Sequence, residues 1–173
     1  IPSMELTNEL MAQCDRVLAT GGGPMVTAAY SSGTPALGVG VGNACITVDD
    51  TANLDETAEK IRISKTLDLA ASCSSDNSVL IFESVYDDLV EKLKAEGGYV
   101  LNEEEKLKLQ HTIWHDGHLN TAIVAQPAHK IAGMAGIELP EGVQFLMVPE
   151  TGAGPDHPFS GEKLSVVMAL FKV

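Results

Sequence analysis

Apolar and polar positions along the first third of the chain follow the order of an open α/β sheet. Ser3 can cap a helix that runs to about Cys14, and residues 17–20 form a short apolar strand. A glycine turn then leads into a helix that Pro24 begins and Gly33 ends, and strands follow at 36–40 and 46–48. Strand, glycine turn, helix and strand is the repeating unit of parallel sheets, so the pattern predicts a Rossmann-type α/β fold.

The remainder of the chain continues this alternation of helices and strands. Asn53 with Glu56 and Asn102 with Glu105 both match a capping box, and each predicts the start of a helix. We expect helices at 53–65, 86–96, 102–110 and 127–135, and strands at 78–82, 121–124, 143–148 and 166–173. A change in composition between residues 63 and 75 predicts a boundary between two lobes.

Composition narrows the class of protein. Apolar residues make up 45% of the chain and charged residues 20%, which is typical of a packed protein. A net charge of -13 without any basic cluster argues against a nucleic-acid partner. No apolar run reaches the roughly 20 residues that span a bilayer, so we expect no membrane partner. The start without methionine and the end in an apolar run favour a truncated chain.

The three cysteines are Cys14, Cys45 and Cys73, and their wide spacing gives neither a disulfide framework nor a metal pair. We therefore expect a reduced, cytoplasmic protein. Small residues surround Cys73, which follows a predicted helix and precedes a strand, where backbone N–H groups can stabilise an oxyanion. A thiolate there would be a nucleophile, but a buried structural thiol fits the composition better. For Cys14 and Cys45 we expect that buried role.

Several polar motifs suit either a ligand or ordinary structure. The turn from Thr20 through Gly21 and Gly22 precedes a helix, where a phosphate can bind backbone N–H groups, yet any tight turn uses such glycines. The glycines between Gly38 and Asn43, Gly42 included, indicate close approach of a ligand or of another strand, and a β-bulge explains them almost as well. Glu162 enters an apolar strand and can bind a ribose or simply face solvent.

The histidines give no metal site. His111, His115 and His118 have tempting spacing, but Asp116 and the glycine after it break any helix between them, so we expect a solvated surface turn. Trp114 beside them is expected to be a packing residue.

Taken in order, these motifs resemble the CoA-acylating branch of the aldehyde dehydrogenase superfamily. The resemblance rests on ATGGGPMV at 19–26, AAYSSG at 28–33, PALGVGVGN at 35–43, SKT at 64–66, Cys73, and HPFSGEKLS at 157–165. It covers nearly the whole chain. The branch includes succinate-semialdehyde and sulfoacetaldehyde dehydrogenases and the aldehyde dehydrogenase half of aldehyde-alcohol dehydrogenases. One departure is Val166, where the family pattern has proline.

The resemblance implies a fold, roles and partners. Residues 1–66 would be the C-terminal part of the NAD(P)-binding domain, and 67–173 an incomplete catalytic domain. Cys73 would attack the aldehyde, and CoA would take the acyl group from the resulting thioester. Thr20, Gly21, Gly22, Gly42 and Asn43 would lie by NAD or NADP, and Glu162 would hold the nicotinamide ribose. The whole protein would be a homo-oligomer, inactive as this segment alone.

The nature of the acyl acceptor follows from a missing residue. Hydrolytic members carry a glutamate that activates water, whereas the aligned residues 40–43 read GVGN, without a carboxylate. Because a thiol needs less base catalysis than water, this favours CoA. Succinate semialdehyde or sulfoacetaldehyde is the expected substrate, followed by acetaldehyde. A hydrolytic dehydrogenase and a non-catalytic α/β scaffold remain the alternatives.

Overall fold

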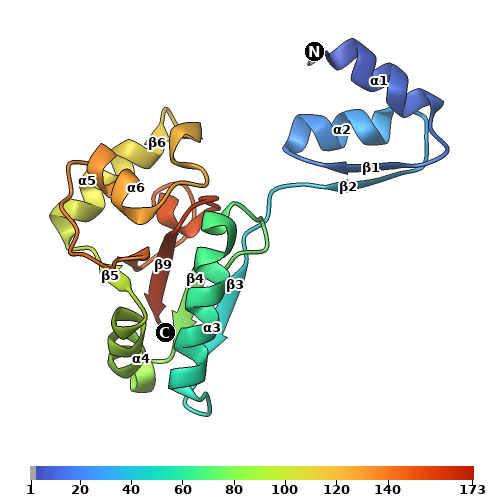
Figure 1. The fold of residues 1–173 in the computed structure, drawn as a ribbon. Helices are drawn as coiled ribbons and strands as arrows, with labels where there is room; N and C mark the ends of the chain where they lie inside the picture. Colours follow the sequence, from blue (N-terminus) through green and yellow to red (C-terminus); the bar gives the residue numbers. More distant parts are fainter. Residues whose placement is uncertain (1–2) are drawn as a thin grey trace. The chain divides into compact units, whose positions relative to one another are not determined.

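The computed structural model describes residues 3–173 and divides into two compact units, which meet in sequence between Gly42 and Asn43. Figure 1 shows the elements of each unit. The domain boundary predicted after residue 66 differs from this division by compactness and stays a prediction.

The first unit contains α1 (Met4–Gln13), β1 (Val17–Thr20), α2 (Gly23–Ser31) and β2 (Ala36–Val39), close to the predicted ranges. Ser3 caps α1 by accepting from the amide of Leu6. β1 and β2 pair in parallel. Of the predicted apolar face of α1, only Met11 is buried, and Met4, Leu6 and Leu10 are exposed.

The second unit holds one parallel sheet with the strand order β3-β4-β9-β8-β5. In chain order its elements are β3 (Cys45–Val48), α3 (Leu54–Thr66), η1 (Leu67–Ala70), β4 (Ser78–Ile81), α4 (Glu83–Ala95), β5 (Gly98–Val100), α5 (Glu103–Ile113), β6 (Trp114–His115), β7 (His118–Leu119), η2 (Thr121–Ile123), α6 (Ala128–Met134), β8 (Phe145–Glu150), η3 (Pro158–Ser160) and β9 (Val167–Lys172). The predicted α/β class with a parallel sheet is confirmed.

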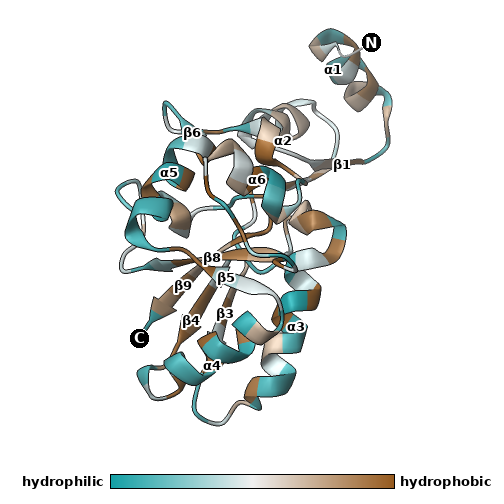
Figure 2. Ribbon diagram, turned by 60° about the vertical axis from the view of Figure 1, so that its left-hand side comes forward, coloured by the Kyte–Doolittle hydropathy of each residue, from teal (hydrophilic) through white to brown (hydrophobic). Residues whose placement is uncertain are grey.

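The core of this unit lies between the sheet and its helices. α3 and α4 pack side by side, and α5 packs against α6. The strands β4, β8 and β9 are nearly continuous apolar runs, visible as brown arrows in Figure 2, and most of their residues are fully buried. Such runs are typical of parallel strands that are covered on both faces.

The two capping boxes differ in the structure. Asn102 accepts from the amide of Glu105, whose carboxylate accepts from the amide of Asn102, so this box is complete. Asn53 caps α3 in the same way, but the carboxylate of Glu56 pairs with Lys60 instead. The start of α3 therefore has only half of the predicted capping box.

The predicted strand at 121–124 is wrong. Asn120 caps a single 3₁₀ turn there, η2, by accepting from the amide of Ala122, and only Ile123 of that turn is buried. One buried side chain suits a turn that docks on the core, whereas a strand would need a partner. The strand β5 and the hairpin formed by β6 and β7 were not predicted from the sequence.

No helix among residues 3–173 has the length and apolar character needed to cross a membrane.

Candidate active site

Cys73 lies in an exposed turn between η1 and β4. The amide of Ser75 donates to the carbonyl of Ser72 at 3.1 Å and closes the turn. The hydroxyl groups of Ser72 and Ser74 lie 2.8 Å apart, so small side chains that bond each other flank the cysteine. Its predicted place between a helix and a strand is confirmed, and its nucleophilic role stays a prediction.

The backbone just before this turn is left-handed. The φ angles are 47° at Asp68, 53° at Leu69 and 55° at Ala70. A residue with a side chain pays roughly 1–2 kcal/mol in this region, and Asp tolerates it best of the three. Ala70 is buried and Leu69 packs on the core, which offsets part of the cost. Strained non-glycine residues concentrate at functional sites, so this strain supports a functional role for the turn.

Asn43 is connected to the segment that carries Glu162. Its amide donates to the carbonyl of Ser160 at 2.9 Å, and its Oδ1 accepts from Nδ2 of Asn77 at 2.5 Å. The same Nδ2 of Asn77 donates to the carbonyl of Gly161 at 2.7 Å. The structure thus brings Asn43 beside the residues that precede Glu162. The connecting residue, the buried Asn77, was missed by sequence reasoning.

Lys163, the next residue after Glu162, is fully buried. Its Nζ donates to the carbonyls of Phe159 at 2.5 Å and Gly161 at 2.9 Å. Burial lowers the pKa of Lys163 well below its ordinary value, and Lys65 adds to the shift. Glu162 itself is half-buried on the loop that leads to β9, as the sequence predicted.

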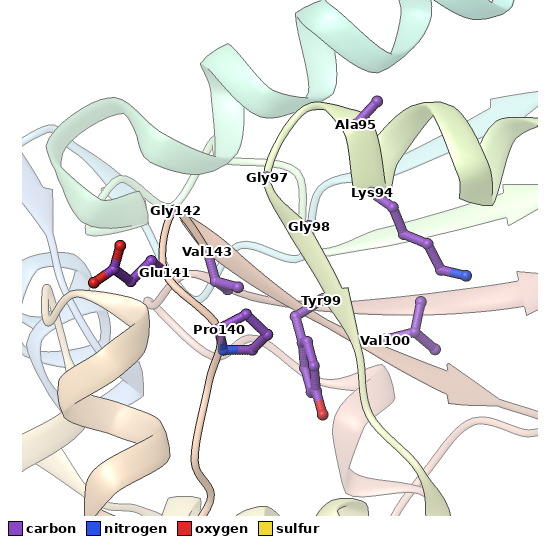
Figure 3. Close-up of a pocket in the computed structure, with 10 residues that line it drawn as sticks. All are labelled: Lys94, Ala95, Gly97, Gly98, Tyr99, Val100, Pro140, Glu141, Gly142 and Val143. Atoms are coloured by element: carbon purple, nitrogen blue, oxygen red, sulfur yellow. The ribbon is translucent and has the colours of Figure 1, made fainter.

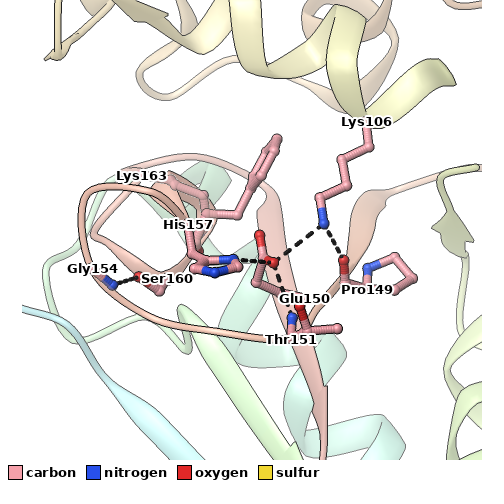
Figure 4. A network of polar contacts seen from close by, with 9 residues as sticks. Lys106, Pro149, Glu150, Thr151, Gly154, His157, Ser160 and Lys163 are labelled. Carbon is pink, nitrogen blue, oxygen red and sulfur yellow. Dashed lines mark hydrogen bonds and ion pairs between the residues drawn. The ribbon is translucent and has the colours of Figure 1, made fainter. Parts of the chain in front are cut away.

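Glu150 holds the other end of this loop (Figure 4). Its Oε1 accepts from the amide of Thr151 at 2.9 Å, lies 2.9 Å from Nδ1 of His157, and is 3.3 Å from Nζ of Lys106. Burial raises the pKa of Glu150, but these three partners outweigh it and hold the pKa below its ordinary value. A side chain at Gly152 would collide with the ring of His157, so glycine is required there.

A second buried lysine, Lys65, lies on the inner stripe of α3 with Ala58 and Ile61. Burial lowers its pKa to about 7 against the attraction of Asp76. Burial raises the pKa of Asp76, while Ser64 and Lys65 lower it in part. Asp76 belongs to the short segment between Cys73 and β4. Sequence reasoning missed this buried lysine. The signal that could have found it was a lysine at a core position of an amphipathic helix.

The glycine turn lies in the first unit. Gly22 is the N-cap of α2, Pro24 follows in its first turn as predicted, and no side chain described by the structure caps this helix. Farther along, Gly38 is explained by packing. A Cβ there would lie 2.6 Å from Val26, and the amide of Gly38 donates to the Tyr30 hydroxyl. Close approach of α2, rather than a ligand or a bulge, accounts for this glycine.

The expectation that Cys14 and Cys45 are buried is wrong. Both are exposed, because Cys14 ends α1 and Cys45 begins β3, at the rim of each unit's own packing. Cys45 lines a hollow of about 340 Å³ together with Asn43 and Ser160. Partial burial raises the pKa of Cys45.

The histidine cluster lies on the surface, as predicted. His115 and His118 face each other across the hairpin, whose turn uses Asp116 and Gly117, and both are exposed like His111. The structure finds no metal-binding group of three ligands among residues 3–173. Trp114 packs edge-on against Phe159 with ring centroids 4.9 Å apart, which confirms its packing role.

A separate hollow of about 580 Å³ lies beside β5 (Figure 3). Its lining includes Lys94, Tyr99 and Glu141. None of the predicted site residues takes part in it, so it lies apart from the candidate active site.

Comparison with known proteins identifies the relatives of this chain. No family model matches the chain. It is 46% identical over 172 residues to the acylating sulfoacetaldehyde dehydrogenase of Cupriavidus necator, covering 98% of this chain and 35% of that protein. It is 44% identical over 173 residues to the bifunctional aldehyde-alcohol dehydrogenase AdhE of Escherichia coli K12, covering 99% of this chain and 19% of that protein.

Solved structures agree with these relatives. An acetylating aldehyde dehydrogenase from Geobacillus thermoglucosidasius superposes with a TM-score of 0.96 at 45% identity, covering 99% of this chain and 38% of that one. Propionaldehyde dehydrogenase from Rhodopseudomonas palustris, solved with bound propionyl-CoA, gives a TM-score of 0.88 at 27% identity, covering 99% and 38%. An engineered glycolyl-CoA reductase with bound NADP+ gives 0.90 at 27% identity, covering 99% and 40%.

The α/β fold with its parallel sheet matches the solved acylating aldehyde dehydrogenases. The relatives of the chain are likewise acylating sulfoacetaldehyde dehydrogenases and the aldehyde-alcohol dehydrogenase AdhE, which confirms the resemblance inferred from its motifs. The chain spans about a third of the sulfoacetaldehyde dehydrogenase and about a fifth of AdhE.

Proposed function

We propose that the whole protein is a CoA-acylating aldehyde dehydrogenase in which Cys73 is the nucleophile. The observation that carries the proposal is the exposed thiol of Cys73 on a strained turn, in a chain whose relatives are acylating dehydrogenases. Small serine side chains around the thiol leave room for an aldehyde. Residues 1–66 then belong to the cofactor-binding domain and 67–173 to the catalytic domain.

The proposed reaction begins with the Cys73 thiolate. Its sulfur forms a bond to the aldehyde carbon, and the carbonyl electron pair moves to oxygen, which takes a proton to give a thiohemiacetal. When bound, NAD(P)+ would supply the acceptor for the hydride of this carbon; with the hydride transferred and the hydroxyl proton released to water, the acyl group would remain on Cys73 as a thioester. The thiolate of CoA then bonds the acyl carbon, the bond to Cys73 breaks, and the free cysteine thiolate returns.

Two parts of the chain fit the cofactor. The N-terminus of α2 offers backbone N–H groups, and since no side chain caps it, Thr20, Gly21 and Gly22 can lie against the phosphates. Asn43 and the loop before Glu162 are bonded together, which suits a carboxylate that must hold ribose hydroxyls at a fixed place. Gly42, next to Asn43, belongs to the same proposed cofactor set.

The preference for CoA over water rests on the missing carboxylate in residues 40–43. General-base catalysis is worth on the order of 10²–10⁴-fold, so a site without the base hydrolyses its thioester slowly. A thiol acceptor is already partly ionised at neutral pH. The relatives named for sulfoacetaldehyde make that aldehyde a first choice, beside succinate semialdehyde and then acetaldehyde.

Replacing Cys73 tests the role of the nucleophile. We expect Cys73→Ala to lower acyl-CoA formation by the whole protein at least about a thousandfold, because the thioester can no longer form. Cofactor binding, measured by quenching of protein fluorescence, should be largely kept. Cys14→Ala is the matched control, since Cys14 is also exposed and lies in the first unit, and it should keep normal turnover. A Cys73→Ala protein that still forms acyl-CoA would refute the assignment.

Alkylation with iodoacetamide gives a second test. All three cysteines are exposed, so reaction alone does not mark the nucleophile. Protection by NAD(P)+ plus aldehyde does, because only a thiol in the active site would be covered by substrate. Peptide mapping should show protection of Cys73 and none of Cys14, whereas equal labelling with and without substrates would favour a non-catalytic scaffold.

The acceptor and the substrate can be read from one assay. The whole protein is mixed with each aldehyde and NAD+ or NADP+, with and without CoA, and reduced nicotinamide is followed by absorbance. Reduction that requires CoA supports the proposal. Equal reduction without CoA, with release of the free acid, would identify a hydrolytic dehydrogenase instead.

A further inference from the structure

The carbonyl oxygens of residues 159, 160 and 161 are all bound by side chains from outside the turn. Phe159 is bound by Lys163, Ser160 by Asn43, and Gly161 by both Asn77 and Lys163. Glu162 is the residue that follows this turn. From this geometry we propose that Asn77 and Lys163, here called the carbonyl-binding pair, are positioning residues that fix the place of Glu162 for the nicotinamide cofactor. The inference rests on the proposed function only for its final step.

Asn77 uses its backbone and its side chain for different tasks. Its backbone amide donates to Ala44 at 2.9 Å and its carbonyl accepts from Ala169 at 3.1 Å, so the main chain belongs to the sheet. Its side-chain nitrogen Nδ2 donates to Oδ1 of Asn43 and to the carbonyl of Gly161. Because the strand contacts come from the backbone, truncating the side chain leaves the sheet paired and releases Asn43 and the turn.

Lys163, the residue after Glu162, donates to the same turn as the side chain of Asn77. Its side chain is fully buried, and the charges of Lys65 and Glu150 act on it in opposite directions. A neutral amine still carries two N–H donors, which matches the two carbonyls that it binds. The contacts therefore survive whichever protonation state burial imposes. Burying a lysine costs free energy. Its hydrogen bonds to the turn before Glu162 explain why Lys163 is buried there.

Both donors act through the turn, because the conformation of Pro158–Ser160 and Gly161 sets where the next residue begins. Glu150 and His157 already fix the beginning of the same loop. The carbonyl-binding pair fixes its end. A carboxylate on a loop that is restrained at both ends loses less conformational entropy when a ribose binds. The restraint therefore increases the affinity for the cofactor.

The first measurement is hydrogen exchange, which needs neither substrate nor cofactor. We expect Asn77→Ala to speed exchange at the amides of Ser160 and Gly161 about tenfold, because their 3₁₀ bonds lose the support of the fixed carbonyls. Asn53→Ala is the matched control. Its side chain also bonds a backbone group, the amide of Glu56, but Asn53 follows β3, whereas Asn43 precedes that strand, so exchange at residues 158–163 should stay unchanged.

The second measurement is the KM for the nicotinamide cofactor in the whole protein. Asn77→Ala and Lys163→Met should each raise it about tenfold with kcat changed less, and the alkylation rate of Cys73 should stay constant. If Asn77→Ala does not fold, Asn43→Ala removes the Ser160 contact from an exposed residue; because Asn43 is itself in the proposed cofactor set, this variant is read by hydrogen exchange, which is expected to speed up at the turn. Asn77→Gln, which restores a donor amide, should recover part of the loss.

The outcomes separate the two proposals. Unchanged exchange at residues 160 and 161 in both Asn77→Ala and Asn43→Ala overturns the inference, whatever the enzyme does. Faster exchange in an active enzyme whose cofactor KM is unchanged overturns it as well, since the turn then does not position Glu162 for the cofactor. A wild-type protein that forms no acyl-CoA refutes the proposed function, while exchange still decides whether the pair fixes the turn.

Discussion

Lys65 gives the stability of the second unit a pH dependence of definite sign and size. The residue is 1% exposed, and burial lowers its pKa from 10.5 to about 7. That difference is about 3.5 units at about 1.4 kcal/mol each, so a charged Lys65 costs the folded state about 5 kcal/mol. This value already includes the attraction of Asp76. We expect Lys65→Met, which keeps the length and removes the charge, to stabilise the unit by about this amount near pH 6.

The advantage of the methionine variant must shrink as the pH rises. Between about pH 7 and 10.5 the unfolded chain keeps a proton on Lys65 that the folded chain has lost, so wild-type stability rises with pH there. The difference between the two proteins should fall from about 5 kcal/mol near pH 6 to below about 1 kcal/mol near pH 10. Lys163, the other buried lysine, is present in both proteins, but Lys65 helps to lower its pKa, so removing Lys65 relieves part of that shift and adds to the advantage of the methionine variant near pH 6.

Urea unfolding followed by tryptophan fluorescence provides the assay, because Trp114 is the chain's single tryptophan and lies in the same unit as Lys65. Lys60→Met is the control, since Lys60 lies on the same helix with its side chain 71% exposed and should change stability by less than about 0.5 kcal/mol. A Lys65→Met advantage that is equal near pH 6 and pH 10, or a loss of stability at both, would refute the reasoning.

Four further substitutions test the local structure by the same urea assay. Asn102→Ala should cost about 1–2 kcal/mol because it breaks a complete capping box, and Asn53→Ala should cost less because its box is half formed; equal costs would contradict this. Gly98→Ala should cost about 1–3 kcal/mol, since its Cβ would lie 2.7 Å from Met147 and 2.8 Å from a backbone carbonyl. Asp68→Gly should gain up to about 1 kcal/mol by relieving a φ of 47°, and a loss would show that the aspartate side chain stabilises the turn.

The order of elements could be predicted because local signals agreed with the fold. Ser3, Asn53 and Asn102 each cap the helix that they were expected to begin, and Pro24 lies in the first turn of α2. The strand expected at 121–124 failed for a tertiary reason. Its apolar residues resemble a strand, but the capping side chain of Asn120 and the docking of Ile123 favour a single turn.

Part of the candidate site was out of reach from the sequence. Asn43, Cys73 and Glu162 could be selected because they belong to motifs of a known family, but the bonds between their segments could not. Asn77 is separated by 34 residues from Asn43 and by 84 from Gly161, and no spacing rule predicts contacts at such separations. Lys163 carried a signal that could have been read, a lysine next to an apolar strand, but its partners are set by the fold of the turn.

Most departures from ordinary protein structure in the second unit lie near the same two segments; the left-handed Asp116 and Ala125 lie elsewhere. Near Cys73 they are the buried Lys65, the left-handed residues 68–70, and the buried Ser78 hydroxyl; near Glu162 they are the buried Lys163, the left-handed Leu164, and the buried Ser165 hydroxyl. Neither serine hydroxyl has a hydrogen-bond partner in the part of the chain that the structure describes. Each feature costs free energy, and none of them is needed to pair the strands. A fold maintains such costs together where function requires them, which supports the assignment of Cys73 and Glu162 to one catalytic apparatus.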